Sequence, residues 1–495
     1  MADNTVRYPE PPAILTGGWN WQLLKYFGAG AILASVTIGS GETLMSSRGG
    51  AIFGYSLLWC MLAASITKGV QVYTAARYMT LTGEHPMEHW AKFPGPPKWI
   101  PIVMVMLCLW CFPTLLAFLC LVMGEIINDM FHVVGPDAAP EVRLFWTRIW
   151  ATLGALVAIT LTLLQSYGFI EKIQTAVVGL LLVSIGAACL ASNPDWLQAL
   201  IGTLVPRMPR YEPWVLEKYG DAFADRPPWV EITAIVGFIG GGSYDYLGYI
   251  GCLREKSWGA IGRKTADDNS SSDETDSYAD GQVHIATDDE NVRRGRIWLR
   301  PAAIDVLVSF GCVFLFSVFF VVLGAVVLYP QQTIPSKEGE LLSLQSQFLT
   351  RFHPSLLYLY QAGVFTAFWG TIYGAYEIYS RTMYECIRPV SQTFRKMSPR
   401  RVQVMVLAYC GIVGLILTWN VEKLIPLMTF PSLMGGVLSC GLWCFGMIWL
   451  DRTKLPPQLR MSKLLTVMTA ISGLILTGMG LKALIDFALS FWPAA

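Results

Sequence analysis

The chain has 495 residues, of which 54% are hydrophobic and only 14% are charged, whereas a soluble globular domain carries about 25% charged residues. This composition excludes an ordinary soluble protein, because so many long apolar runs need a lipid environment. The net charge of +1 gives no reason to expect nucleic acid or an acidic partner. The partner that the composition predicts is the lipid bilayer.

Apolar stretches recur along the chain, and each is long enough to cross a hydrocarbon layer of about 30 Å as a helix. The polar start lacks a basic region followed by a short apolar run, so it is not a cleavable signal peptide. With the N-terminus inside, most Lys and Arg residues fall in cytoplasmic loops, as membrane topology requires. We therefore predict a multi-pass protein of the plasma (inner) membrane with a cytoplasmic N-terminus and an extracytoplasmic C-terminus. The eleven predicted spans are 24–48, 52–75, 99–124, 146–166, 169–191, 230–251, 301–329, 355–380, 402–420, 423–450 and 463–491.

Glycines interrupt the first and the sixth of these spans. The first contains Gly39-Ser40-Gly41-Glu42, and the sixth contains Gly240-Gly241-Gly242-Ser243. Glycine lowers helix propensity, and backbone groups that are freed in mid-membrane must line a cavity. The two interruptions lie five spans apart, which is the pattern of an inverted repeat with its binding site between the broken helices. Close helix packing through glycine is the alternative interpretation.

The chain divides around these two repeats. The predicted parts are a cytoplasmic segment (1–20), a first repeat with spans 1–5 (21–200), an extracytoplasmic loop (201–229), a second repeat with spans 6–10 (230–450), and an eleventh span with the C-terminus (451–495). The second repeat includes a cytoplasmic loop at 252–300, and residues 264–292 of this loop are strongly acidic. A flexible connector is the simplest interpretation of the acidic stretch, with a regulatory or cation-attracting role as the alternative.

Two carboxylates stand at the predicted breaks. Glu42 and Asp245 lie in the first turn of the half-helix that follows each break, where a charge near mid-membrane is costly unless it is used. Each either complements the dipole of its half-helix or faces the cavity as a cation ligand or proton acceptor. Glu42 is the predicted metal ligand, and Glu42, Thr366 and Thr371 are the candidates for a coupling ion. The predicted substrate-binding residues are Gly39, Ser40, Gly41, Glu42, Thr43, Gly240, Gly241, Gly242, Ser243, Tyr244 and Asp245.

Catalytic and cofactor sites are not predicted. All five histidines fall outside the predicted spans, which excludes an imidazole relay inside the membrane. The eleven cysteines lie mostly within apolar runs, where they act as small hydrophobic residues. No Ser/His/Asp, Cys/His or metal-ligand cluster lies within reach of the predicted cavity, so we expect no enzyme and no cofactor.

Several stretches are similar to the Nramp family of metal transporters. Gln71-Val-Tyr-Thr-Ala-Ala-Arg77 with Thr82-Gly83 resembles the end of the family's second span, and Gly168-Phe-Ile-Glu171-Lys172 resembles the start of its fifth. Arg254 stands where the sixth span of the family usually ends. The resemblance implies the LeuT-type fold, which is an all-α membrane protein. Here it would have eleven transmembrane helices, a five-plus-five inverted repeat, one extra helix, and a broken first and sixth helix.

The binding motifs of the family are replaced in this chain. Residues 39–42 stand where the family has Asp-Pro-Gly-Asn, and residues 240–243 stand where it has Met-Pro-His-Asn. By this comparison only Glu42 replaces the lost carboxylate, one helical turn away. Loss of the methionine predicts loss of selectivity for soft metals. A hard cation such as Mg²⁺ or Mn²⁺ is then the expected substrate, held by a carboxylate, carbonyls and waters.

A second resemblance leaves the substrate open. Ile38-Gly39-Ser40-Gly41 is similar to the Gly-Ser-Gly break of amino-acid/polyamine/organocation transporters, in which exposed N–H groups receive a substrate carboxylate. We therefore predict an ion-coupled secondary transporter that works by alternating access and moves a hard divalent cation. The alternatives are a transporter of a small anion or amino acid through the same site, and a membrane sensor on a transporter scaffold. Glu42 argues against an anion, because its charge repels one.

Overall fold

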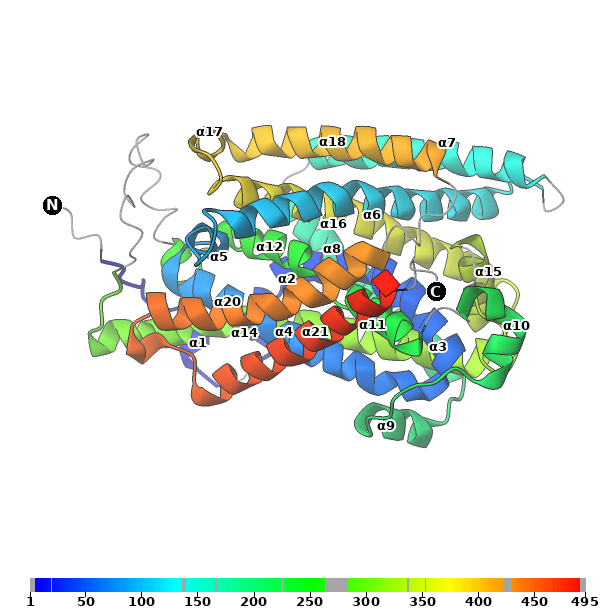
Figure 1. Ribbon diagram of the computed structural model, residues 1–495, viewed down its shortest axis with the longest axis horizontal. Helices are drawn as coiled ribbons and strands as arrows, with labels where there is room; N and C mark the ends of the chain where they lie inside the picture. The colour runs from blue at the N-terminus through cyan, green and yellow to red at the C-terminus, as the bar shows by residue number, and fades with distance from the viewer. Residues whose placement is uncertain are drawn as a thin grey trace.

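Long helices lying side by side form the molecule (Figure 1). The computed structural model describes residues 5–18, 20–135, 139–164, 167–223, 227–262, 284–335, 338–351, 353–421 and 429–489. Within these ranges every named element is a helix, and Val6 and Ile285 form an isolated bridge. The predicted all-α class is confirmed.

Eight helical stretches in the described part of the chain are long and apolar enough to cross a membrane. The predicted span at 230–251 is absent from this set because two short helices build it. The predicted span at 24–48 is also absent, and α16 covers the predicted span at 355–380. The full number of eleven crossings stays a prediction. The eight stretches are Ser47–Thr82, Trp99–Phe131, Pro140–Leu164, Lys172–Ala191, Asp289–Leu328, Pro399–Asn420, Thr429–Lys454 and Lys463–Leu489.

The named elements are helices of three kinds. Elements η1, η3, η4 and η7 are 3₁₀-helices, and η2, η5 and η6 are π-helices. In chain order the elements are α1 (Ala13–Thr16), η1 (Trp21–Tyr26), α2 (Ala29–Thr37), η2 (Ile38–Ser46), α3 (Ser47–Phe53), η3 (Gly54–Leu57), α4 (Leu58–Thr82), α5 (Pro86–Trp90), α6 (Trp99–Phe131), α7 (Pro140–Leu164), α8 (Tyr167–Ala191), α9 (Trp196–Leu204), α10 (Pro213–Phe223), α11 (Pro228–Phe238), α12 (Ser243–Cys252), η4 (Leu253–Glu255), α14 (Asp289–Leu323), η5 (Gly324–Leu328), α15 (Glu338–Thr350), α16 (Leu356–Ile387), α17 (Gln392–Arg395), α18 (Pro399–Asn420), η6 (Ser432–Leu438), α20 (Ser439–Lys454), η7 (Pro457–Leu459) and α21 (Lys463–Leu489).

The sixth predicted span consists of two short helices, α11 and α12. Helix α11 ends at Phe238 and α12 begins at Ser243, so residues 239–242 are outside both helices. Gly240 and Gly241 have φ angles of +69° and +80°, a region of backbone conformation that glycine adopts without the strain other residues would suffer. This interrupted segment, residues 239–242, exposes backbone groups in the middle of the helix stack.

The first predicted span differs from its expectation. Helix α2 passes directly into the π-helix η2, which contains Gly39 and continues into α3. Thr371 of α16 contributes to the π-helical conformation, because its hydroxyl accepts a hydrogen bond from the Gly39 amide at 3.1 Å. A Cβ on Gly39 would lie 2.2 Å from that hydroxyl oxygen. The glycine therefore allows α16 to approach a widened turn, a feature that often marks functional sites.

Asp305 of α14 anchors the start of α2. One carboxylate oxygen accepts from the amide of Gly28 at 2.8 Å, and the other accepts from Gly30 at 2.9 Å and from the Tyr249 hydroxyl at 2.8 Å. Asp305 is fully buried. It therefore satisfies free amides in the first turn of α2 and ties that helix to α12 and α14.

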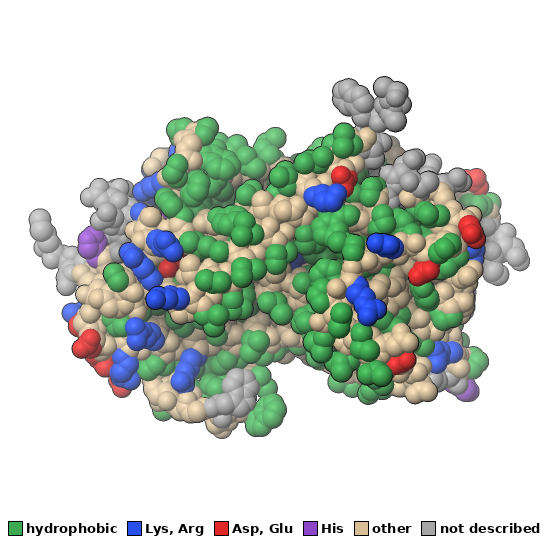
Figure 2. Space-filling view, turned by 60° about the horizontal axis from the view of Figure 1, so that its bottom comes forward, with side chains coloured by type: hydrophobic (Ala, Val, Ile, Leu, Met, Phe, Trp, Pro, Cys, Tyr) green, Lys and Arg blue, Asp and Glu red, His purple; other side chains and the backbone are tan. Residues whose placement is uncertain are grey.

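The surface is consistent with a bilayer environment. Figure 2 shows Lys and Arg side chains clustered toward the end that carries α1 and α5 in Figure 1, with hydrophobic side chains spread across the middle of the visible face. Apolar side chains such as Leu164, Val183 and Leu474 are more than 60% exposed. Such large exposed apolar residues are costly in water and favourable in lipid.

Candidate functional site

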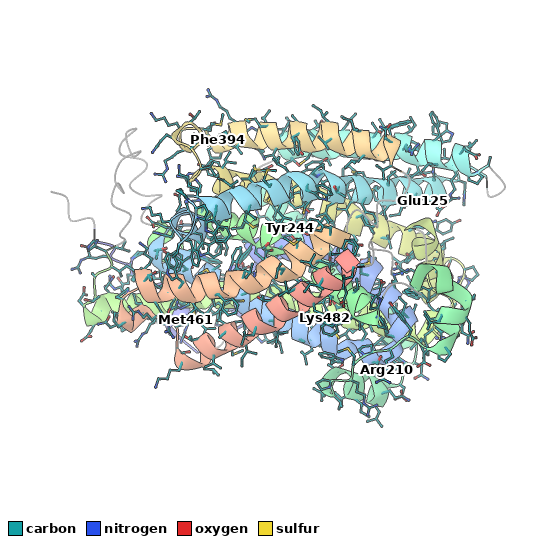
Figure 3. The ribbon with its side chains drawn as sticks, viewed as in Figure 1. Glu125, Arg210, Tyr244, Phe394, Met461 and Lys482 are labelled. Atoms are coloured by element: carbon teal, nitrogen blue, oxygen red, sulfur yellow. The ribbon has the colours of Figure 1, made fainter. Side chains whose placement is uncertain are left out.

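Two carboxylates from different helices bind the interrupted segment. Glu42 of η2 accepts a hydrogen bond from the Gly240 amide at 2.9 Å through Oε1, and Asp245 of α12 accepts one from Gly242 at 2.7 Å through Oδ2. Their residues are 0% and 3% exposed. Figure 3 labels the neighbouring Tyr244 near the middle of the long axis of the molecule. The structure thus brings the two predicted acidic residues to one segment.

Each of these carboxylates keeps one oxygen unused. Glu42 Oε2 and Asp245 Oδ1 have no hydrogen-bond partner among the described residues. The two side chains also interact electrostatically with each other. A buried polar atom without a partner is costly, so these two oxygens are suited to receive a cation or a proton.

Lys68 of α4 lies at the same segment and was missed by sequence reasoning. Its Nζ donates to the carbonyl oxygens of Val236, Gly237, Ile239 and Gly241 at 2.8, 3.1, 2.6 and 2.8 Å. The residue is fully buried. The available signal was a single lysine within the apolar span predicted at 52–75, a position at which a charged residue is rare unless it has a function.

Cys440 of α20 also borders this group. Its thiol interacts with the Lys68 charge and the Gln71 side chain, and it donates to the Gly435 carbonyl at 3.4 Å. The sequence assigned this cysteine to apolar packing alone. The structure therefore places a soft sulfur atom beside a group of hard oxygen atoms, and the thiols of Cys108 and Cys111 also interact electrostatically with Asp245.

The remaining predicted residues of the breaks support the backbone. Thr43 Oγ1 donates to the Ile38 carbonyl at 2.6 Å, and the Ser243 hydroxyl lies 2.6 Å from that of Ser439. The ring of Tyr244 packs edge-on against Phe112, with centroids 6.1 Å apart. Gly41 belongs to η2. The side chain of Ser40 and most of the acidic stretch, residues 264–283, lie outside the described residues.

The two threonines proposed for a coupling ion have different positions. Thr371 Oγ1 donates to the Ser35 carbonyl at 2.7 Å and accepts from the Gly39 amide, so it joins α16 to the first span. Thr366 Oγ1 donates to the Ala362 carbonyl at 2.7 Å, one turn earlier in α16. The structure thus brings Thr371 to the first span, whereas it shows the hydroxyl of Thr366 used within its own helix.

No group of three or more His, Cys, Asp and Glu side chains that could hold a metal ion occurs in the described ranges. A cation at the interrupted segment would therefore use the free oxygens of Glu42 and Asp245, with its other positions filled by carbonyl groups or retained water. Such a mixed oxygen set is characteristic of hard, partly hydrated ions.

Comparison with known proteins relates the chain to one family. Residues 30–242 match the family described as "Nramp: Natural resistance-associated macrophage protein-like". The chain is a relative of the Nramp proteins. It is 28% identical over 198 residues to "Metal transporter Nramp3" of Oryza sativa subsp. japonica, which is 38% of this chain and 32% of that relative. It is 26% identical over 218 residues to "Divalent metal cation transporter MntH" of Chromohalobacter salexigens, which is 42% of this chain and 46% of that relative.

These matches span 32% and 46% of the lengths of the two curated relatives. By their names, both relatives are metal transporters. Their resemblance, together with the eight apolar helices, makes this Nramp relative an integral membrane protein.

Solved structures extend the comparison to the fold of nearly the whole chain. The manganese transporter of Eremococcus coleocola, in complex with an aromatic bis-isothiourea substituted compound, superposes with a TM-score of 0.63 at 14% identity, covering 99% of this chain and 95% of that one. MhsT in complex with L-phenylalanine gives a TM-score of 0.52 at 13% identity, covering 92% and 98%. At these identities the likeness concerns the fold alone. The chain has the LeuT-type fold of these structures.

Proposed function

We propose that this Nramp relative is an ion-coupled secondary transporter that moves a hard divalent cation, Mg²⁺ or Mn²⁺, across the membrane. The observation that carries the proposal is the pair of buried carboxylates, Glu42 and Asp245, each with one free oxygen at the interrupted segment. Two negative charges from two different helices attract a cation, and carboxylate oxygens are ligands that hard cations prefer. The names of the matched relatives point to the same class of substrate.

The position of the site supports transport by alternating access. Glu42 belongs to the first proposed repeat (21–200) and Asp245 to the second (230–450), so a bound ion would touch both repeats. In this type of transporter, one repeat rocks against the other around a fixed site. We propose that the cation stays bound to both repeats while the site changes from open on one side of the membrane to open on the other. The N-terminus lies on the cytoplasmic side in this proposal.

The charges at the site favour a cation over an anion. Glu42, Asp245 and Lys68 carry a net charge of −1 when all three are ionised. The ammonium group of Lys68 donates to four carbonyl oxygens, so its N–H groups are not available to bind an anion. An anion or an amino-acid carboxylate would face the free oxygens of two carboxylates, which repel it. The anion alternative therefore has less support from the geometry.

Uptake into proteoliposomes tests this proposal. Purified protein would be offered radiolabelled Mn²⁺, Mg²⁺ with an internal indicator, labelled amino acids, and small anions, with protein-free liposomes as the control. We expect saturable uptake of Mn²⁺ and Mg²⁺ only, and an internal pH dye reports whether protons accompany them. Saturable uptake of an amino acid or anion without cation uptake would overturn the proposal.

Soft cations are expected to be poor competitors of this transport. The two free ligand atoms are carboxylate oxygens, so excess Cd²⁺ should inhibit Mn²⁺ uptake no more strongly than excess Mg²⁺ does. Competition curves on the same proteoliposomes measure this directly. The Cys440→Ser variant is the matched control, because it replaces the thiol that interacts with Lys68 at the interrupted segment. Strong Cd²⁺ inhibition that disappears in this variant would mean that the thiol is a ligand and that the site is not purely hard.

A further inference from the structure

The carbonyl groups at the end of α11 account for the position of Lys68. The last carbonyls of a helix have no partners within it. Here the carbonyl of Ile235 accepts from the Ile239 amide, and that of Phe238 accepts from the Gly241 amide. Lys68 Nζ takes the two carbonyls that lie between them, Val236 and Gly237. Its ammonium group therefore completes the hydrogen bonding of the last turn of α11.

The contacts of Lys68 extend beyond the end of this helix. Nζ also donates to the carbonyls of Ile239 and Gly241, at 2.6 and 2.8 Å. Three N–H groups thus serve four oxygens, an arrangement of convergent carbonyls around a dehydrated positive charge. Unwound carbonyls and half-helix C-termini are the groups that hold coupling cations in transporters with broken helices. A lysine that only satisfied the helix end would not need the two carbonyls of the interrupted segment.

We propose that Lys68 is a tethered cation that fills a monovalent-cation site formed by the carbonyl oxygens of residues 236, 237, 239 and 241. The side chain is 0% exposed, so its ammonium cannot reach water along the stem, as lysines near span ends do. Glu42 and Asp245 interact electrostatically with it, which offsets the cost of burying its charge. The interrupted segment therefore holds its shape without a dissolved Na⁺ or K⁺ ion, and the two carboxylates remain for the transported ion.

Removing the side chain should turn the filled site into a binding site. Lys68→Ala leaves the carbonyl oxygens around an empty space with the size of an alkylammonium group. Oxygen distances of 2.6–3.1 Å suit methylammonium, ammonium or K⁺ better than the smaller Na⁺. The site that this variant exposes should therefore take a small monovalent cation.

Thermal unfolding of purified variants in methylammonium, K⁺, Na⁺ or N-methyl-D-glucamine chloride at equal ionic strength tests the proposal. We expect the midpoint of Lys68→Ala to rise on the order of 2 °C when methylammonium is present at about ten times its dissociation constant. Lys68→Met is the matched control, because it also lacks the charge but fills the space. It should not respond, and neither should the wild type or Lys482→Ala, which removes an exposed lysine. Equal responses of Lys68→Ala and Lys68→Met would overturn the proposal.

A measurement on the wild type keeps the proposal testable if both variants fail to fold. Among the described lysines, Lys68 is the one that is buried. Protein with ¹⁵N-labelled lysine should therefore show one Nζ signal that has the chemical shift of a charged ammonium and exchanges its hydrogens slowly. A neutral amine shift, or the absence of any protected Nζ signal, would contradict a tethered cation.

A transport measurement extends the inference, and this part alone rests on the proposed function. Uptake of Mn²⁺ by the wild type should be the same within about two-fold when Na⁺, K⁺ or N-methyl-D-glucamine is the only monovalent cation, because the site is already filled. A strict requirement for Na⁺ or K⁺ would overturn the inference. If no Mn²⁺ uptake occurs in any salt, the proposed function fails, and the unfolding and NMR measurements still decide the role of Lys68.

Discussion

Glu42→Gln is expected to lower Mn²⁺ uptake into proteoliposomes by about 100-fold, which corresponds to ~2.7 kcal/mol of lost ion binding. In the wild type, Glu42 Oε1 accepts a hydrogen bond from the backbone amide of Gly240. The side-chain oxygen of the glutamine can still accept this bond. What the substitution removes is the negative charge and the free Oε2. The loss should therefore appear in ion binding and transport, while the helices around the site keep their packing.

Two further variants and the thermal midpoints serve as comparisons for Glu42→Gln. Asp245→Asn should reduce uptake to a similar extent, because it removes the second free oxygen of the site. Thr366→Val is the control that should transport within about two-fold of the wild type, because the Thr366 hydroxyl donates to a carbonyl of its own helix. The thermal midpoints of Glu42→Gln and the wild type should agree closely. Wild-type uptake by Glu42→Gln would show that the ion does not use this carboxylate.

The interrupted segment and its two carboxylates were predictable from residues whose requirements are local. Gly240 and Gly241 adopt left-handed backbone angles of +69° and +80°, and runs of glycine indicate such angles without knowledge of the fold. Glu42 and Asp245 were recognisable because a carboxylate within an apolar span is expensive. Both signals are contained in a few consecutive residues.

The conformation of the first span was not predictable in the same way. Gly39 indicated an unwound segment, yet the chain there forms a π-helix. The hydrogen-bond partner of its amide is the hydroxyl of Thr371, which lies 332 positions later in the sequence. Whether a glycine opens a helix or widens it depends on such a distant partner, and a single sequence does not show it.

Lys68 was overlooked for a related reason. One lysine hardly changes the average hydropathy of a long apolar span, and topology reasoning counts only the charges in the loops. Its four acceptors lie 168–173 positions away in the sequence. The fold supplies the reason for the lysine, because the carbonyls that it needs become available only where α11 ends.

Asp305→Ala is expected to be among the most destabilising substitutions near the site. The carboxylate accepts from the amides of Gly28 and Gly30 and from the hydroxyl of Tyr249, and all of this lies in a fully buried position. Each donor left without a partner in such a place costs about 1–3 kcal/mol. Because these bonds join α2 to α12 and α14, their loss should loosen the first span against the sixth, and the thermal midpoint should fall by several degrees.

Asp305→Asn separates the hydrogen bonds from the charge. Its amide oxygen can still accept from Gly28 and Gly30, and its amide nitrogen can donate to the hydroxyl of Tyr249 if that hydroxyl reverses its role. We therefore expect a smaller fall of the midpoint than in Asp305→Ala, and Mn²⁺ uptake closer to that of the wild type. Asp486→Asn alters an exposed ion pair with Lys482. It should change the free energy of unfolding by less than about 0.5 kcal/mol. Equal midpoints for Asp305→Ala and the wild type would show that the start of α2 is held by contacts other than this carboxylate.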